Sequence, residues 1–183
     1  MAGSGHNGGP SLQPGASWRV HCWRAAREQL LPTLPIEVVR LRVKRARDLG
    51  LEYKTYASVR ASTGHDLIAF LFSSNALRLL RGAEALPKDR IEKLDAMACA
   101  RIALAVAPLL PQAVLANPQI DSAYPAPFAL AKFAEARAAI RLALGKVPGD
   151  RVLLVGDMAL EQEWCAAGRL AGYLPAERFF AGA

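Results

Sequence analysis

The chain has 183 residues, 52% hydrophobic and 21% charged, which is enough for one hydrophobic core but too little for two. Its cysteines, Cys22, Cys99 and Cys165, are odd in number and far apart, which argues against a disulfide framework and indicates a reducing, cytoplasmic location. The net charge is +7, and residues 1–60 hold ten Lys/Arg against four Asp/Glu. This asymmetry predicts a polyanionic partner, with nucleic acid the first choice, whereas a solubilising surface is the alternative explanation.

The N-terminal residues 1–16 are rich in Gly, Ser and Pro, and we expect them to form a flexible arm. They lack the apolar run of a signal peptide. A single globular domain is predicted for residues 17–183, with a basic helical part over residues 17–62. Ser17 is a suitable N-cap for the first helix of that part, which carries Arg24 and Arg27.

The stretch "IEVVRLRVKRARDLG", residues 36–50, is the clearest amphipathic pattern, and Gly50 is a suitable helix stop. The apolar positions that share one helical arc, and that we expect to be buried, are Ile36, Val39, Val43 and Ala46. Beside this arc the sequence predicts a basic stripe of Arg40, Lys44 and Arg47, and Arg42 and Arg45 project on the other flank. Residues 51–63 fit either a short helix or a strand by periodicity, and we favour the helix because Gly64 follows as a suitable stop.

Two later stretches share one layout: a glycine, an aspartate, an apolar run, a small polar residue and then Ala-Leu. They predict strands at residues 66–73 and 151–156, and hence a predominantly helical α/β fold with a small, largely buried sheet of two or three strands. The pair Thr63 and Asp66 also resembles a capping box, so residues 64–80 could instead form one helix in an all-α domain. Periodicity does not separate these alternatives, because almost every position is apolar.

Further helices are predicted over residues 88–107 and 128–145, with a proline-rich loop between them. The most membrane-like segment, residues 98–116, contains Arg101, Gln112 and two prolines, so we do not expect it to span a membrane. It could provide the interface of a structural subunit in a larger assembly.

Polar residues follow both predicted strands. Asp157 ends one, and Ser73, Ser74 and Asn75 end the other, which is where open α/β sheets bind ligands. Helix capping would explain the same residues, and the sequence contains no G-x-S-x-G elbow. The histidines lack metal-binding spacing, and no phosphate loop or G-x-G-x-x-G motif occurs, so no metal or nucleotide cofactor is predicted.

We therefore interpret the sequence as a small binding or accessory protein rather than an enzyme. Its basic helices should contact a polyanion, with the nucleic-acid backbone the leading choice and another protein the alternative. The residues expected to make this contact are Arg40, Lys44, Arg47, Arg42, Arg45, Arg24 and Arg27. The alternative function is a hydrolase-like α/β enzyme whose site would be formed by Asp157, Ser73, Ser74 and Asn75.

Overall fold

The computed structural model describes residues 34–80 and 85–181. The chain divides into two compact units, residues 1–39 and 40–183, and the sheet belongs wholly to the second unit. That sheet has five parallel strands in the order β3-β2-β1-β4-β5. The strands are β1 (Ala69–Ser73), β2 (Ala100–Ala105), β3 (Ser122–Pro125), β4 (Val152–Gly156) and β5 (Gly172–Pro175).

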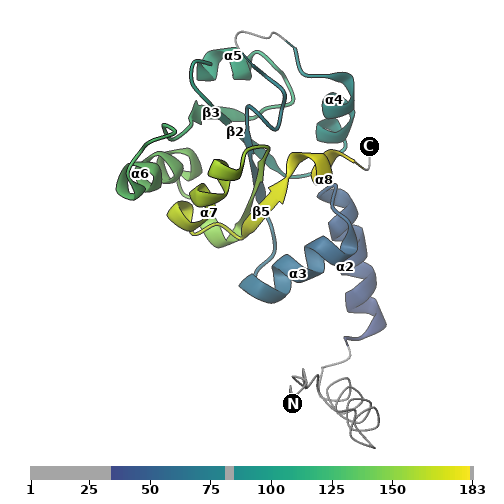
Figure 1. Cartoon of the computed structure of the whole chain (residues 1–183). Coiled ribbons are helices and arrows are strands. Elements are labelled where there is room, and N and C mark those ends of the chain that lie inside the picture. Colours follow the sequence, from purple (N-terminus) through teal and green to yellow (C-terminus); the bar gives the residue numbers. More distant parts are fainter. Residues whose placement is uncertain (1–33, 81–84, 182–183) are drawn as a thin grey trace, which may run out of the picture. The chain divides into compact units, whose positions relative to one another are not determined.

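Helices connect the strands and cover both faces of the sheet (Figure 1). The α-helices are α2 (Ile36–Asp48), α3 (Tyr53–Thr63), α4 (Lys88–Asp95), α5 (Pro111–Leu115), α6 (Phe133–Leu144), α7 (Gln162–Gly168) and α8 (Ala176–Phe180). Two short 3-10 helices, η1 (Gly149–Arg151) and η2 (Ala159–Glu161), flank β4. The chain is therefore a doubly wound α/β fold, the arrangement that buries an all-parallel sheet.

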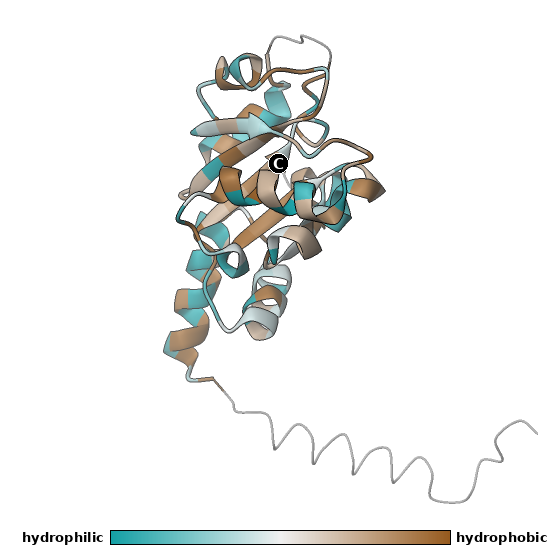
Figure 2. Cartoon of the chain, turned by 90° about the vertical axis from the view of Figure 1, so that its left-hand side faces the viewer, coloured by the Kyte–Doolittle hydropathy of each residue, from teal (hydrophilic) through white to brown (hydrophobic). Residues whose placement is uncertain are grey.

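Alternate residues of the central strand face the two helical layers. Phe70 and Phe72 join the layer that contains α3, α4 and α8, whereas Leu71 packs with residues of α6 and α7. The ring of Phe72 lies 5.6 Å from that of Phe179 and 6.4 Å from that of Phe180, which anchors α8 on the sheet. Figure 2 shows the result as hydrophobic strands in the interior and mixed hydropathy along α2.

The predicted sheet of two or three strands is wrong, and so is the all-α alternative, although the α/β class is supported. The strands predicted at residues 66–73 and 151–156 exist as β1 and β4. The helix predicted over residues 88–107 is wrong in its second half, because α4 ends at Asp95 and β2 begins at Ala100. Pairing with β1 on one side and β3 on the other outweighs the helix propensity of this alanine-based segment.

The helix at residues 36–50 is confirmed, and Gly50 follows it with a left-handed φ of +66°. The predicted buried arc is only partly right: Ala46 is buried, but Ile36 is 61% exposed and Val43 37% exposed. The arm at residues 1–16, the helix after Ser17, Arg24 and Arg27 lie outside the described residues. Within the described residues, none of the helices has the length and apolarity that a membrane crossing requires.

Candidate functional site

The predicted strand-end residues lie where the order of strands in the sheet reverses. From β1 the chain proceeds outward to β2 and β3, then returns across the sheet to β4 and β5. Phe72 of β1 is paired with Val155 of β4, so Ser73 and Gly156 end neighbouring strands at the same edge. In open α/β sheets this topological switch point, at the carboxyl ends of the strands, is where ligands bind.

A carboxylate that the sequence did not single out connects these two strand ends. Glu161 Oε2 accepts hydrogen bonds from Ser73 Oγ at 2.9 Å and from the backbone N–H groups of Asp157 and Met158 at 2.7 and 3.1 Å. Its Oε1 accepts a hydrogen bond from Asn75 Nδ2 at 2.8 Å. Glu161 is 2% exposed, so four donors stabilise a carboxylate that is almost entirely removed from water.

The hydroxyl groups of both serines at this edge form hydrogen bonds with backbone N–H groups. Ser73 is fully buried, and its Oγ also accepts a hydrogen bond from the N–H of Ala76. Ser74 is 1% exposed, and its Oγ accepts from the N–H of Val106 after β2. A nucleophilic serine must reach its substrate, so this burial disfavours serine chemistry at the edge.

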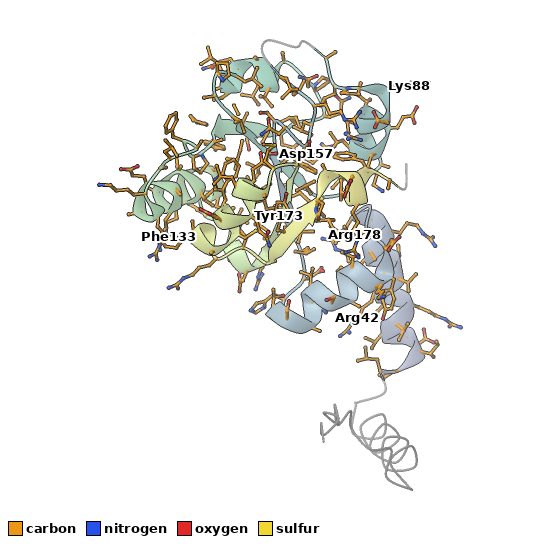
Figure 3. All side chains as sticks on the ribbon, in the orientation of Figure 1. Arg42, Lys88, Phe133, Asp157, Tyr173 and Arg178 are labelled. Carbon is orange, nitrogen blue, oxygen red and sulfur yellow. The ribbon has the colours of Figure 1, made fainter. Side chains whose placement is uncertain are left out.

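Charged side chains lie near this hydrogen-bonded network, and Asp157 is one of them. The Asp157 side chain is labelled in Figure 3, and the residue is exposed. Arg90 of α4 is buried with its guanidinium 3.9 Å from the ring centre of Phe180, and burial lowers its pKa. Asp89 forms an ion pair with Arg90 and raises its pKa, and the more distant charges of Arg78 and Asp157 lower and raise it, respectively. Charges of both signs therefore lie near this edge.

No metal site emerges in the part of the chain that the structure describes, because no three His, Cys, Asp or Glu side chains converge there. The thiols of Cys99 and Cys165 are unpaired and partly buried. Burial raises the pKa of Cys99 to about 11 and that of Cys165 to about 12, so both remain thiols at neutral pH.

The predicted basic stripe lies on the exposed side of α2. At 100° per residue, Arg40, Lys44 and Arg47 fall within one arc, and all three are exposed. Ala46, on another side of the helix, is 1% exposed. Across the described ranges, neither Lys44 nor Arg47 forms an ion pair with a carboxylate. Their charge is therefore available to a partner.

Other basic residues of this region are part of the fold. Arg45 Nε donates to Asp66 Oδ2 at 3.1 Å, and its Nη2 donates to the carbonyl oxygen of Leu67 at 2.8 Å. The same aspartate accepts from Tyr56 OH at 2.8 Å and lies 3.7 Å from Arg60 Nη1. Arg45 and Arg60 therefore hold the segment that precedes β1 against α2 and α3. Arg42, labelled in Figure 3, is half-buried.

A cavity of about 560 Å³ lies beside Arg47. It is lined by residues of α2, the start of α3, α4 and the end of the chain from β5 to α8. Arg178 of α8, labelled in Figure 3, belongs to this lining and donates from Nη2 to Thr55 Oγ1 of α3 at 3.1 Å. Sequence reasoning missed the cavity because its lining comes from three segments that are far apart in the chain, residues 43–55, 92–96 and 174–181.

Comparison with known proteins gives no match: no family model, curated protein or solved structure is similar to this chain. Three features of the structure bear on function: the closed strand edge, the basic side of α2 and the cavity beside Arg47.

Proposed function

We propose that the chain is a binding protein whose α2 helix docks electrostatically on the phosphate backbone of a nucleic acid. Residues 40–60 contain seven Lys/Arg against two Asp/Glu, a net charge of +5 out of the +7 of the whole chain. Such a local excess attracts polyanions, and each phosphate that is neutralised releases condensed counterions.

The observation that carries the proposal is the exposure of Lys44 and Arg47 on the same side of one helix, without a carboxylate partner in the described residues. Side chains one turn apart can contact successive phosphates along a strand or groove. Arg45 and Arg60 contribute to the local potential but are occupied by Asp66, so we assign the direct contacts to Lys44 and Arg47, with Arg40 on the same side.

The experiment compares two double variants, each of which removes two positive charges, from two different surfaces of the protein. We expect Lys44→Gln with Arg47→Gln to weaken binding of a mixed-sequence oligonucleotide by about tenfold or more at low salt, because two phosphate contacts are lost. The matched control is Arg141→Gln with Lys146→Gln, two exposed residues of α6 and the turn after it, on the other face of the sheet.

The control variant should bind within about twofold of wild type, since it changes the net charge equally without changing α2. Equal weakening in both variants would mean that only net charge matters. Unchanged binding in the α2 variant, or no binding at low salt, would refute the proposed function.

A second candidate function is a small-molecule site at the switch point, which is supported by the sheet topology and by the convergence of Ser73, Asn75 and Asp157. Because Ser73 is buried, any such site would use the exposed Asp157 carboxylate and the Asn75 amide. Hydrolysis of a simple activated ester by the wild type, lost in Asp157→Asn, would favour this candidate. Equal rates in the two proteins would count against it.

A further inference from the structure

The cavity beside Arg47 has an apolar interior bounded by aromatic rings. Its apolar lining includes Leu51, Tyr53, Leu174 and Phe179. Phe179 is 3% exposed and fixed by ring contacts with Phe180 at 4.8 Å and with Phe72 at 5.6 Å. A volume of about 560 Å³ lies within the range of about 300–1,000 Å³ that small-molecule sites occupy, so the cavity can admit a planar base with its sugar.

Three cations line the same cavity: Arg47, Lys93 and Arg178. Lys93 is half-buried with its Nζ 5.5 Å from the ring centre of Phe179, and within residues 34–80 and 85–181 it forms no ion pair. Burial lowers the pKa of Lys93, and the charge of Glu52 only partly opposes this effect. A partly desolvated ammonium without an ion-pair partner is stabilised by an incoming acceptor, such as the carbonyl oxygen of a base or a phosphate oxygen.

Two carboxylates complete the lining, Glu52 and Glu92. Glu92 lies 3.8 Å from Lys88 Nζ on the same helix, at a surface position. Carboxylates beside an apolar interior suit an occupant that carries N–H donors as well as a flat apolar surface. A nucleobase has both, whereas a fatty-acid chain has no donor to offer them.

We propose that the nucleic acid bound by α2 is single-stranded, and that one unstacked base enters this cavity while the flanking phosphates contact Arg47 and Lys44. This inference rests on the proposed function and names the form of nucleic acid that the site accepts. In a duplex the bases are paired and stacked inside, so only phosphates would reach α2. In a single strand they are free to stack on aromatic side chains.

The test measures binding of three fluorescent ligands of one sequence, about 12 residues long: single-stranded DNA, single-stranded RNA and duplex DNA. Ala96→Trp fills the cavity, because Ala96 is an exposed residue of its lining. Ala98→Trp is the matched control, because Ala98 is also exposed but does not line the cavity. Thermal unfolding of both variants checks that they are folded.

We expect wild type to bind at least one single strand about tenfold more tightly than the duplex, since base stacking adds to phosphate contact. Ala96→Trp should remove this preference and leave duplex binding unchanged, whereas Ala98→Trp should retain it. A higher affinity for RNA than for DNA would indicate a contact with the 2′-hydroxyl.

Equal affinity for single strands and duplex, or an unaltered preference in Ala96→Trp, would overturn the inference. Loss of binding in Lys44→Gln with Arg47→Gln, together with equal affinity for the three ligands, would leave the proposed function standing and remove only the single-strand assignment. If that double variant binds all three ligands as well as wild type does, both proposals fail.

Discussion

The hydroxyl of Ser73 donates a 2.9 Å hydrogen bond to the carboxylate of Glu161, a residue 88 positions later in the chain, and both side chains are buried. This bond joins the carboxyl ends of β1 and β4 at the point where the sheet reverses its order. In many α/β proteins a ligand occupies this place. Here the carboxylate of Glu161 accepts hydrogen bonds from the donors at this edge, so the protein's own side chain stabilises the two strand ends.

Replacing Glu161 should therefore reduce stability more than replacing a surface glutamate. Glu161→Ala leaves four donors without their acceptor, and we expect the free energy of unfolding to fall by about 3 kcal/mol. Glu161→Gln keeps one acceptor oxygen and should cost about 1 kcal/mol. Urea denaturation measures both values, with the exposed Glu163→Ala as control. An Ala variant as stable as wild type would show that water replaces the carboxylate.

A methyl group at Gly156 should disturb the same network. A Cβ atom there would lie 2.6 Å from Glu161 Oε2 and 2.6 Å from Tyr173 Cε2, and the four hydrogen bonds prevent Glu161 from moving aside. We expect Gly156→Ala to lower the free energy of unfolding by about 2 kcal/mol. Gly64→Ala is an informative contrast, because no atom lies within 4 Å there and only the φ of +76° opposes the change. A larger loss at Gly64 than at Gly156 would contradict this account.

Replacement of Arg45 should lower the stability of the protein, whereas replacement of Arg47 should not. Arg45→Met loses the hydrogen bonds to Asp66 and to the Leu67 carbonyl, and we expect a loss of about 1 kcal/mol, reduced by partial exposure. Arg47→Met should change stability by less than about 0.5 kcal/mol, because the side chain is exposed. Thermal unfolding of the two variants tests the distinction. Equal stability of the two proteins would remove the structural role assigned to Arg45.

The two described cysteines should make the protein less stable in alkali. Burial raises the pKa of Cys165 to about 12 and that of Cys99 to about 11, from an ordinary value of 9.0. The unfolded chain therefore releases these protons first, and the stabilisation present below pH 9 is lost as the pH rises towards 11. Cys165→Ala should flatten the fall in unfolding free energy between pH 9 and 11 by up to about 1.4 kcal/mol per pH unit. If the unfolding free energy of Cys165→Ala falls with pH as steeply as that of wild type, the raised pKa of Cys165 is contradicted.

The strands β1 and β4 could be predicted from sequence, whereas the inner strand β2 and the edge strands β3 and β5 could not. Val152–Gly156 is short, valine-rich and bounded by turn residues, so β4 is evident from its residues alone. Ala100–Ala105 has the composition of a helix and becomes β2 only because β1 and β3 lie on either side of it. The edge strands β3 and β5 have four residues each and end in proline, too short for a periodic signal.

The candidate sites were partly predictable for the same reason. The basic stripe of α2 follows from helical spacing alone, and it is exposed as expected. Glu161 was missed because a glutamate in the first turns of a helix is usually explained by the helix dipole. Its position four residues after the strand-end Asp157 was the available signal. Lys93 and Arg178 have no local pattern, since only the folded chain brings α4 and α8 to the side of Arg47.

The salt dependence of binding tests the central claim most directly, namely that Lys44 and Arg47 contact phosphates. For a single-stranded oligonucleotide, the logarithm of affinity falls with the logarithm of salt concentration by about 0.7 for each phosphate contacted. Lys44→Gln with Arg47→Gln should make this slope shallower by about 1.4, while Arg141→Gln with Lys146→Gln should leave it as in wild type. A slope that is the same in wild type and in the α2 variant would contradict the account.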